Sequence, residues 1–155
     1  MNSEKEHLIN QFDNLLKVKN GFHKRGNTWY IKNAAYYSLV NCQISRFAKN
    51  KYYLNLGLLF LGLKEGNSIS NAKWHYWNRY EDILKNFTSI SDDDYTLTTA
   101  KKNTERVLKN LEKFHIPLMK KISDIKFLKA NLPYGKELGL FLVRYPDHKA
   151  FMESL

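Results

Sequence analysis

The hydrophobic pattern of the chain changes its period near Asn27, and this change limits the possible folds more than any other feature. Beyond it, apolar and polar residues alternate in the stretches TWYIK, YYSLVNCQISRF and KYYLNLGLLFLGL. The connection NAA is short enough for a hairpin, so we expect three antiparallel strands in a meander. A fourth strand is expected at residues 72–80, after the turn-rich KEGNSISN. Because sequential strands usually pair, strand order should follow chain order.

The alternation also separates two faces of the predicted sheet. One, the apolar face, carries Val40, Cys42, Ile44, Leu54, Leu56, Leu58 and Phe60. The other, the mixed face, carries Tyr37, Leu39, Asn41, Gln43, Ser45, Tyr53, Asn55, Gly57 and Leu59. Antiparallel sheets commonly bury one face, so we expect helices to cover the apolar face and leave the mixed face to solvent or to a partner.

The residues before the sheet predict an amphipathic helix. Ser3 and Glu6 have the spacing of a capping box, in which each side chain satisfies a backbone N–H of the first turn. One apolar stripe follows at helical spacing, formed by Leu8, Ile9, Phe12, Leu15 and Leu16. Gly21 can end this helix.

The second half of the chain is predicted to be helical. A helix is expected over residues 98–114, with the chain bent or broken at Pro117 and a short helix capped by Ser123. A final helix pair is expected in residues 135–155, interrupted at Pro146. These elements predict a single α+β domain of residues 1–155, with an antiparallel sheet of about four strands, an N-terminal helix and a C-terminal helical half packed on one face.

The basic residues of the chain are unevenly distributed. The formal net charge is +10, and residues 14–64 contain nine Lys or Arg and no Asp or Glu. The sheet region is therefore positive. This pattern fits a solvated lysine-rich surface, an acidic protein partner, or nucleic acid, whose phosphates bind Lys and Arg.

Known catalytic and cofactor motifs find no match in the sequence. Cys42 is the single cysteine and is expected to be a buried, inert thiol, and the five histidines do not have metal-binding spacing. No glycine-rich phosphate loop and no convergent carboxylate pair is recognisable. We therefore predict no catalytic residue, metal or cofactor, although Tyr, Lys and His side chains could still converge in a pocket that the sequence does not reveal.

Neither a signal peptide nor a membrane span is predicted. The stretch MNSEKEHLINQF has charges where a signal peptide needs an apolar core, and the longest apolar run, LNLGLLFLGL, is shorter than the about 20 residues that cross a bilayer. With a lone cysteine, these features predict a cytoplasmic protein that does not bind membranes.

The candidate binding site is the mixed face. Its expected members are the aromatic residues Trp29, Tyr37, Tyr53 and Trp77, the amides Asn41, Gln43 and Asn55, and the cations Arg25, Lys32 and Arg46. Aromatic residues and Arg are typical anchors of protein interfaces, and aromatic rings beside cations can also stack bases of single strands. Aromatic residues also favour strands for packing alone, so ordinary sheet packing is the third interpretation.

Several stretches together resemble a known family, the bacterial domain of unknown function 4304. GFHKRGNTWYIKN resembles the basic, glycine-containing start of its first strand, and YSLVNCQISRF and YYLNLGLLFLG resemble its next two strands. WHYWNRYEDIL and TTAKKNTERVLKNLEKFHIPLMKKISDIKFLKANL are similar to its fourth strand and its long helix. HYWNRYE is more aromatic here than the histidine-arginine version of the family. The resemblance implies a bacterial origin, an α+β fold and no particular activity.

Together, the missing catalytic motifs and the basic, aromatic face lead to two functional hypotheses. The first is a non-enzymatic protein–protein interaction module of the immunity or antitoxin type, with an acidic protein as partner; small families of this kind often stand beside toxin genes. The alternative is a single-stranded nucleic-acid-binding protein that uses the same face.

Overall fold

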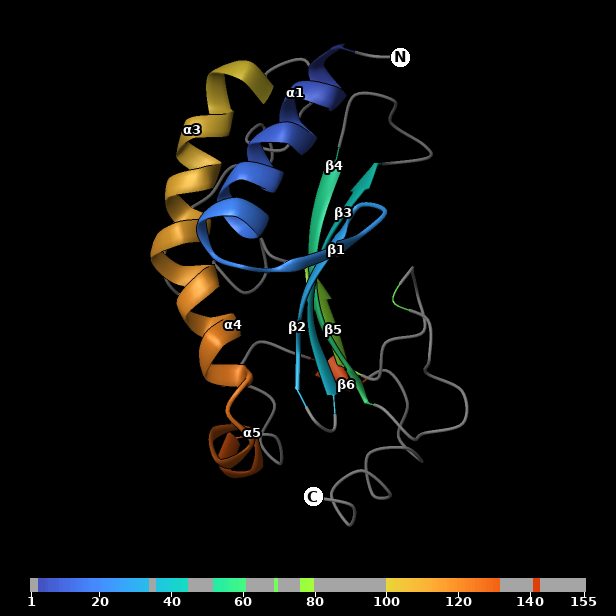
Figure 1. Ribbon diagram of the computed structural model, residues 1–155, viewed down its shortest axis with the longest axis vertical. Helices are drawn as coiled ribbons and strands as arrows, with labels where there is room; N and C mark the ends of the chain where they lie inside the picture. The colour runs from blue at the N-terminus through green and yellow to red at the C-terminus, as the bar shows by residue number, and fades with distance from the viewer. Residues whose placement is uncertain are drawn as a thin grey trace.

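A layer of helices lies against one side of an antiparallel β-sheet (Figure 1). The computed structural model describes residues 3–33, 36–44, 52–60, 69, 76–79, 100–131 and 141–142. Within these residues, all helices lie on the same side of the sheet (Figure 1). The α+β fold and the one-sided helical layer predicted from the sequence are confirmed.

Among the described residues, the sheet has six strands in chain order, β1-β2-β3-β4-β5-β6, and each pairs antiparallel with the next. The four strands predicted from the sequence correspond to β2 (Thr28–Lys32), β3 (Tyr36–Ile44), β4 (Tyr52–Phe60) and β5 (Tyr76–Arg79). Two short strands, β1 (His23–Arg25) and β6 (Phe141–Leu142), extend it at its two edges. The meander is therefore as predicted, with a short strand added at each end.

The helical layer has an N-terminal and a C-terminal part. The N-terminal part is α1 (Ser3–Phe12), continued by the π-helical segment η1 (Asp13–Lys19). The C-terminal part consists of α3 (Ala100–Asn110), the π-helical segment η4 (Leu111–His115), α4 (Ile116–Ile122) and α5 (Ile125–Asn131). No helix among the described residues is long and apolar enough to span a membrane.

Two glycines with positive φ bring the chain from the helix into the sheet. Gly21 (φ +72°) ends η1, and the backbone N–H groups of Gly21 and Phe22 donate to the carbonyls of Lys17 and Leu16 at 3.0 and 2.9 Å. Gly26 (φ +59°) begins the two-residue turn between β1 and β2, where a left-handed conformation matches the twist of a hairpin. An L-residue with a side chain would be strained at either position.

The sequence predicted a bend or a break at Pro117, and the structure shows no break there. Pro117 lies in the first turn of α4, directly after η4, and Ile116 before it keeps helical dihedral angles (φ −61°, ψ −44°). Pro117 has no N–H to donate, and the N–H of Ile116 before it bonds five residues back to the Leu111 carbonyl, so the helix changes from the π to the α pattern at the position of the missing donor.

The predicted cap of the short helix is also wrong. Asp124, not Ser123, caps α5, since Asp124 Oδ1 accepts from the backbone N–H groups of Lys126 (2.8 Å) and Phe127 (3.4 Å). The hydroxyl of Ser123 instead bonds the Met119 carbonyl of the preceding helix at 2.8 Å.

A third correction concerns the expected final helices. Phe141–Leu142 forms β6 and pairs with Tyr76–Trp77 of β5, so this part of the predicted helix is a strand. The open edge of β5 offers backbone groups that a strand can pair with, which outweighs the local helical pattern. The rest of residues 135–155 lies outside the described residues.

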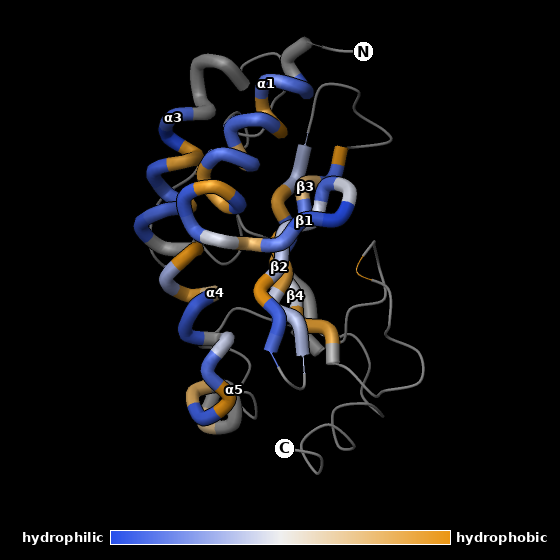
Figure 2. Tube along the Cα trace, in the orientation of Figure 1, coloured by the Kyte–Doolittle hydropathy of each residue, from blue (hydrophilic) through white to orange (hydrophobic). Residues whose placement is uncertain are grey.

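The main core lies between the helices and the apolar face. From the helices it takes Leu8, Phe12, Leu15, Leu16, Val107, Leu111, Ile116 and Met119, and from β2, β3 and β4 it takes Trp29, Tyr36, Val40, Cys42, Tyr52, Leu54, Leu56 and Leu58. Figure 2 shows apolar residues recurring among hydrophilic ones along α1 and α3. Each large side chain buried here contributes about 1.5–3 kcal/mol, so the core is the main source of stability.

Asp13 connects the helical layer to the sheet. Its Oδ1 accepts from Trp29 Nε1 at 2.8 Å, and its Oδ2 pairs with Lys24 Nζ at 2.6 Å. Lys24 Nζ also lies 5.3 Å from the centroid of the Trp29 ring. Phe12, the preceding residue, meets the same ring edge-on at 5.6 Å. One carboxylate therefore positions both the buried indole and the start of the sheet.

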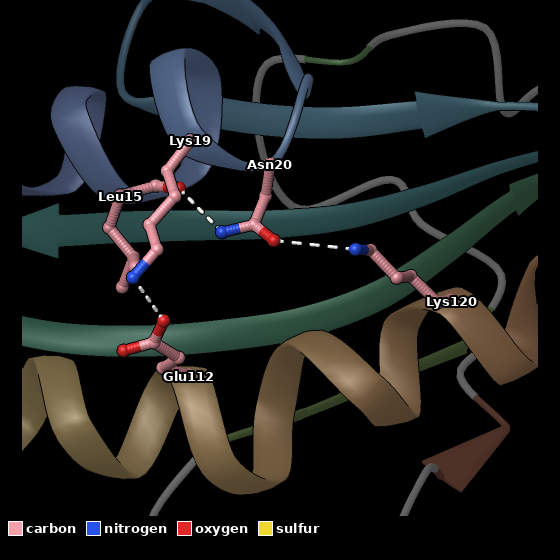
Figure 3. A network of polar contacts seen from close by, with 5 residues as sticks. All are labelled: Leu15, Lys19, Asn20, Glu112 and Lys120. Carbon is pink, nitrogen blue, oxygen red and sulfur yellow. Dashed lines mark hydrogen bonds and ion pairs between the residues drawn. The ribbon is translucent and has the colours of Figure 1, made fainter.

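Polar contacts between the two parts of the layer lie near the end of η1 (Figure 3). Lys19 pairs with Glu112 of η4, and Asn20 accepts from Lys120 Nζ at 3.3 Å while its own amide donates to the Leu15 carbonyl at 2.8 Å. Lys19 and Glu112 are both largely exposed, so this ion pair orients the helices with little effect on stability.

We expect Asp13→Ala to lower the free energy of unfolding by about 1–3 kcal/mol, because it leaves the Trp29 N–H without an acceptor and Lys24 without its counterion. Asp13→Asn keeps an acceptor for Trp29 and should cost less. Urea unfolding followed by tryptophan fluorescence measures both, with the exposed Asn14→Ala as the control. Equal losses in the two Asp13 variants would contradict the role given to the indole bond.

Candidate interaction surface

The register of β3 and β4 determines which residues form the mixed face. Tyr37 pairs with Leu59, Asn41 with Asn55, and Gln43 with Tyr53. The alternate pairs of the same two strands point to the apolar side. One of them, Val40 with Leu56, belongs to the main core. The division of β3 and β4 into two faces is confirmed.

Trp29 does not belong to the mixed face, so this part of the predicted site is wrong. It pairs with Val40, is fully buried and packs in the main core against Phe12. Because side chains alternate along a strand, the register between β2 and β3 puts Trp29 on the helical side and its neighbours Thr28 and Tyr30 on the mixed side.

Three rings that lie close together take the place expected for Trp29. His23 of β1 stacks on Tyr30 of β2, with centroids 5.4 Å apart and 30° between the planes. Tyr30 in turn meets Tyr37 of β3 edge-on at 5.3 Å. We call His23, Tyr30 and Tyr37 the aromatic row. The sequence analysis missed His23 and Tyr30; once Trp29 is assigned to the core, strand alternation would have placed Tyr30 on this face.

Part of the mixed face is buried. Leu39, Leu59 and Ile69 form a second apolar cluster, against which Tyr30 and Tyr37 pack. Leu39 and Leu59 are fully buried, and Ile69 is 7% exposed. The aromatic row therefore rests on an apolar base and keeps only partial exposure, except for His23, which is exposed.

A chain of amide hydrogen bonds crosses the polar end of the mixed face. Asn41 Nδ2 donates to the Asn27 carbonyl at 3.2 Å and to Thr28 Oγ1 at 3.0 Å. Asn55 Nδ2 donates to Asn41 Oδ1 at 3.2 Å and to Gln43 Oε1 at 3.1 Å. We call this set the amide relay. It connects β2, β3 and β4, and it brings together all three amides predicted for the site.

One buried atom of the amide relay has no hydrogen-bond partner among the described residues. Asn55 is 3% exposed, and its Oδ1 accepts no hydrogen bond from the described residues. Its Nδ2 has already used both hydrogens, so the arrangement depends on Asn55 presenting a donor, not an acceptor, to Asn41 and Gln43.

The positive charges of the sheet region differ in their surroundings. Lys19 and Lys24 are paired with Glu112 and Asp13. Arg25 and Lys32, at two corners of the mixed face, are exposed, and no described acid pairs with either. None of the residues that the structure assigns to this face is acidic, so the described part of the face carries positive charge only.

Three more residues were predicted for the site, Tyr53, Trp77 and Arg46, and the structure describes the first two of them. Tyr53 is half-buried and pairs with Gln43. Trp77 lies in β5 opposite Gly57 by its backbone register. Arg46 lies outside the described residues.

Cys42 and Tyr36 lie on the apolar face and are buried. Burial raises the pKa of the Cys42 thiol to about 12, and the charge of Lys5 offsets only part of this effect. Burial, with a further contribution from the carboxylate of Asp124, raises the pKa of Tyr36 to about 12. Neither group is an accessible nucleophile at neutral pH. Among the described residues, no three His, Cys, Asp or Glu side chains gather to hold a metal.

The molecule is thus an α+β protein in which helices cover one face of an antiparallel meander and the opposite face carries aromatic, amide and cationic side chains. Comparison with protein families gives a match over residues 12–121 to the domain of unknown function DUF4304, and the chain belongs to this family. The resemblance seen in the sequence is therefore confirmed. No match was found among curated proteins or solved structures.

We expect stability to fall as pH rises from about 9 toward 12, because Cys42 and Tyr36 stay protonated in the fold but ionise near 9.0 and 10.0 when unfolded. Below pH 9 their contribution is complete. Cys42→Val should make the alkaline loss shallower in urea titrations at several pH values. In native protein at pH 8 the thiol should not react with Ellman's reagent, and reaction at the rate of urea-unfolded protein would contradict its burial.

Asn55→Asp should be strongly destabilising near neutral pH, by about 2–5 kcal/mol, because it points a buried carboxylate at Asn41 Oδ1 and Gln43 Oε1. Burial among acceptors raises the pKa of the new carboxyl above its unfolded value of about 4. Stability should therefore recover below pH 4 and be lost as pH rises. Asn14→Asp, at an exposed position, is the control for the added charge in unfolding experiments across this range. Equal, pH-independent effects of both changes would refute the relay.

Proposed function

We propose that this chain is a non-enzymatic interaction protein whose mixed face binds an acidic protein partner. The observation that carries the proposal is the pair of exposed cations, Arg25 and Lys32, on a face to which the described structure contributes no acid. Complementary charge of this kind accelerates association and selects among partners.

The aromatic row supports a protein partner. Tyr and Arg are common anchors of protein interfaces, because a large ring buries much area at small entropic cost. Tyr30 and Tyr37 are partly exposed and held by the Leu39–Leu59–Ile69 cluster, so little ordering would be needed upon binding. The amide relay adds rigidity at the other end of the face.

An immunity or antitoxin role in a bacterial cytoplasm is the specific form of this proposal. Such a protein inhibits its partner by occupying a surface, which requires no catalytic group. The genomic neighbourhood gives a direct test: co-expression with an adjacent toxic gene product should restore growth. A neighbouring toxin that this protein fails to suppress would count against the immunity role.

The interaction itself is tested with charge-reversed variants. Arg25→Glu with Lys32→Glu should lose a partner that wild type captures from its host at low salt, after nuclease treatment. Lys17→Glu with Lys121→Glu makes the same charge change on exposed residues of the helical layer and should retain the partner. The purified pair should then dissociate as salt increases, because exposed charges are screened beyond about 8 Å at physiological ionic strength. A partner retained by both variants would exclude the mixed face.

Single-stranded nucleic acid is the second candidate, favoured by the stacking of His23 on Tyr30 between Arg25 and Lys32. Base stacking on aromatic side chains is worth about 1–3 kcal/mol per base. Fluorescence anisotropy with labelled oligothymidylate at low salt tests it. Binding that is lost in His23→Ala and in the Arg25, Lys32 variant would support this candidate, and no binding by wild type would remove it.

A further inference from the structure

The orientation of every amide in the relay is determined by one backbone group. The Asn27 carbonyl can only accept, so the group of Asn41 that faces it must be the –NH₂. The oxygen of Asn41 then faces Asn55, whose –NH₂ must donate to it. The second hydrogen of that –NH₂ goes to Gln43, which must present its oxygen. Reversing any one amide would bring two acceptors or two donors together.

Gln43 is the outer end of this chain of bonds. Its oxygen faces inward to Asn55, so its –NH₂ is left to point away from the relay. The residue is exposed, and its Nε2 donates to none of the described residues. An exposed glutamine normally turns its amide to suit either kind of partner, but here the inward bond leaves two donors outward.

We infer that Gln43 is a specificity-determining hydrogen-bond donor for an acidic peptide segment of the partner, a proposal that rests on the function proposed above. The outward amide accommodates only an acceptor, and carboxylates and peptide carbonyls are the acceptors that an acidic segment supplies. The positive charge of Arg25 and Lys32 on the same face favours the acidic segment over a neutral one. Gln43 thus adds geometric selection to an electrostatic attraction.

The substitution Gln43→Glu keeps the inward acceptor of this side chain and changes only its outward donor. A glutamate oxygen can still accept from Asn55 Nδ2, so the relay and the fold are retained. The outward group becomes an acceptor instead of a donor and meets the acceptors of the ligand unfavourably. Asn14→Asp introduces the same charge change on the exposed surface of η1, outside the mixed face, and is the matched control.

The experiment uses full-length protein and a short labelled oligoglutamate peptide, with anisotropy measured at about 0.15 M ionic strength, where distant charges are screened. Wild type should bind, and Gln43→Glu should lose about tenfold or more in affinity, as expected for a close donor turned into an acceptor. Asn14→Asp should change affinity by less than about twofold. In ¹H–¹⁵N spectra, the side-chain –NH₂ signals of Gln43 should shift during the titration.

Each other outcome has a distinct meaning. Equal losses in Gln43→Glu and Asn14→Asp, or unmoved Gln43 –NH₂ signals during binding, would overturn the role of Gln43 and leave the proposed function standing. Wild-type binding that is unaffected by Arg25→Glu with Lys32→Glu would overturn the proposed function itself. Oligothymidylate binding in place of the peptide, with the same dependence on Gln43, would assign the donor to nucleic acid and overturn the peptide proposal. Thermal unfolding verifies that each variant is folded.

Discussion

The pairing of β2 with β3 is the constraint on which the rest of the molecule depends. Its register sets Trp29 opposite Val40, within reach of Phe12 and Asp13, and sets Tyr30 opposite Leu39 on the other side of the sheet. A slip of one residue would exchange these sides and expose the indole. The same pairing places Thr28 beside Asn41 and so begins the amide relay. Core, helix attachment and surface chemistry thus share a single backbone alignment.

The same alignment puts Lys24 on the helical side of the sheet and Arg25 and Lys32 on the mixed face. Asp13 and Glu112, on the helical side, neutralise Lys24 and Lys19. The cations of the mixed face receive no such compensation from the described residues. The net charge of the chain alone says little about a partner. Two cations on one face, without an acid among the described residues to pair with them, say more, because they indicate which face has a positive potential.

The fold was largely predictable from the sequence. The alternating pattern of the strands and the helical spacing of apolar residues each put the apolar side chains on one side of an element, and the core is formed by those sides. The alternation placed Asn41, Gln43 and Asn55 together correctly. Trp29 was misplaced because its side depends on how the hairpin aligns two strands, which no single strand reveals. The cap of the short helix was assigned to Ser123 instead of Asp124, and a bend or a break was left open at Pro117, because capping and π-helical turns are decided by neighbouring backbone groups. The strand at Phe141–Leu142 depends on pairing with a distant segment, which a local pattern does not encode.

The described residues of the mixed face include no acid, which bears on self-association. In a two-fold symmetric dimer each residue of the interface faces the same patch on the other copy. Two mixed faces brought together would set Arg25 and Lys32 against their own duplicates, and the amide of Gln43 against described residues that include no carboxylate. The described residues of this face therefore disfavour a symmetric homodimer built through it, because like charges would repel across the interface.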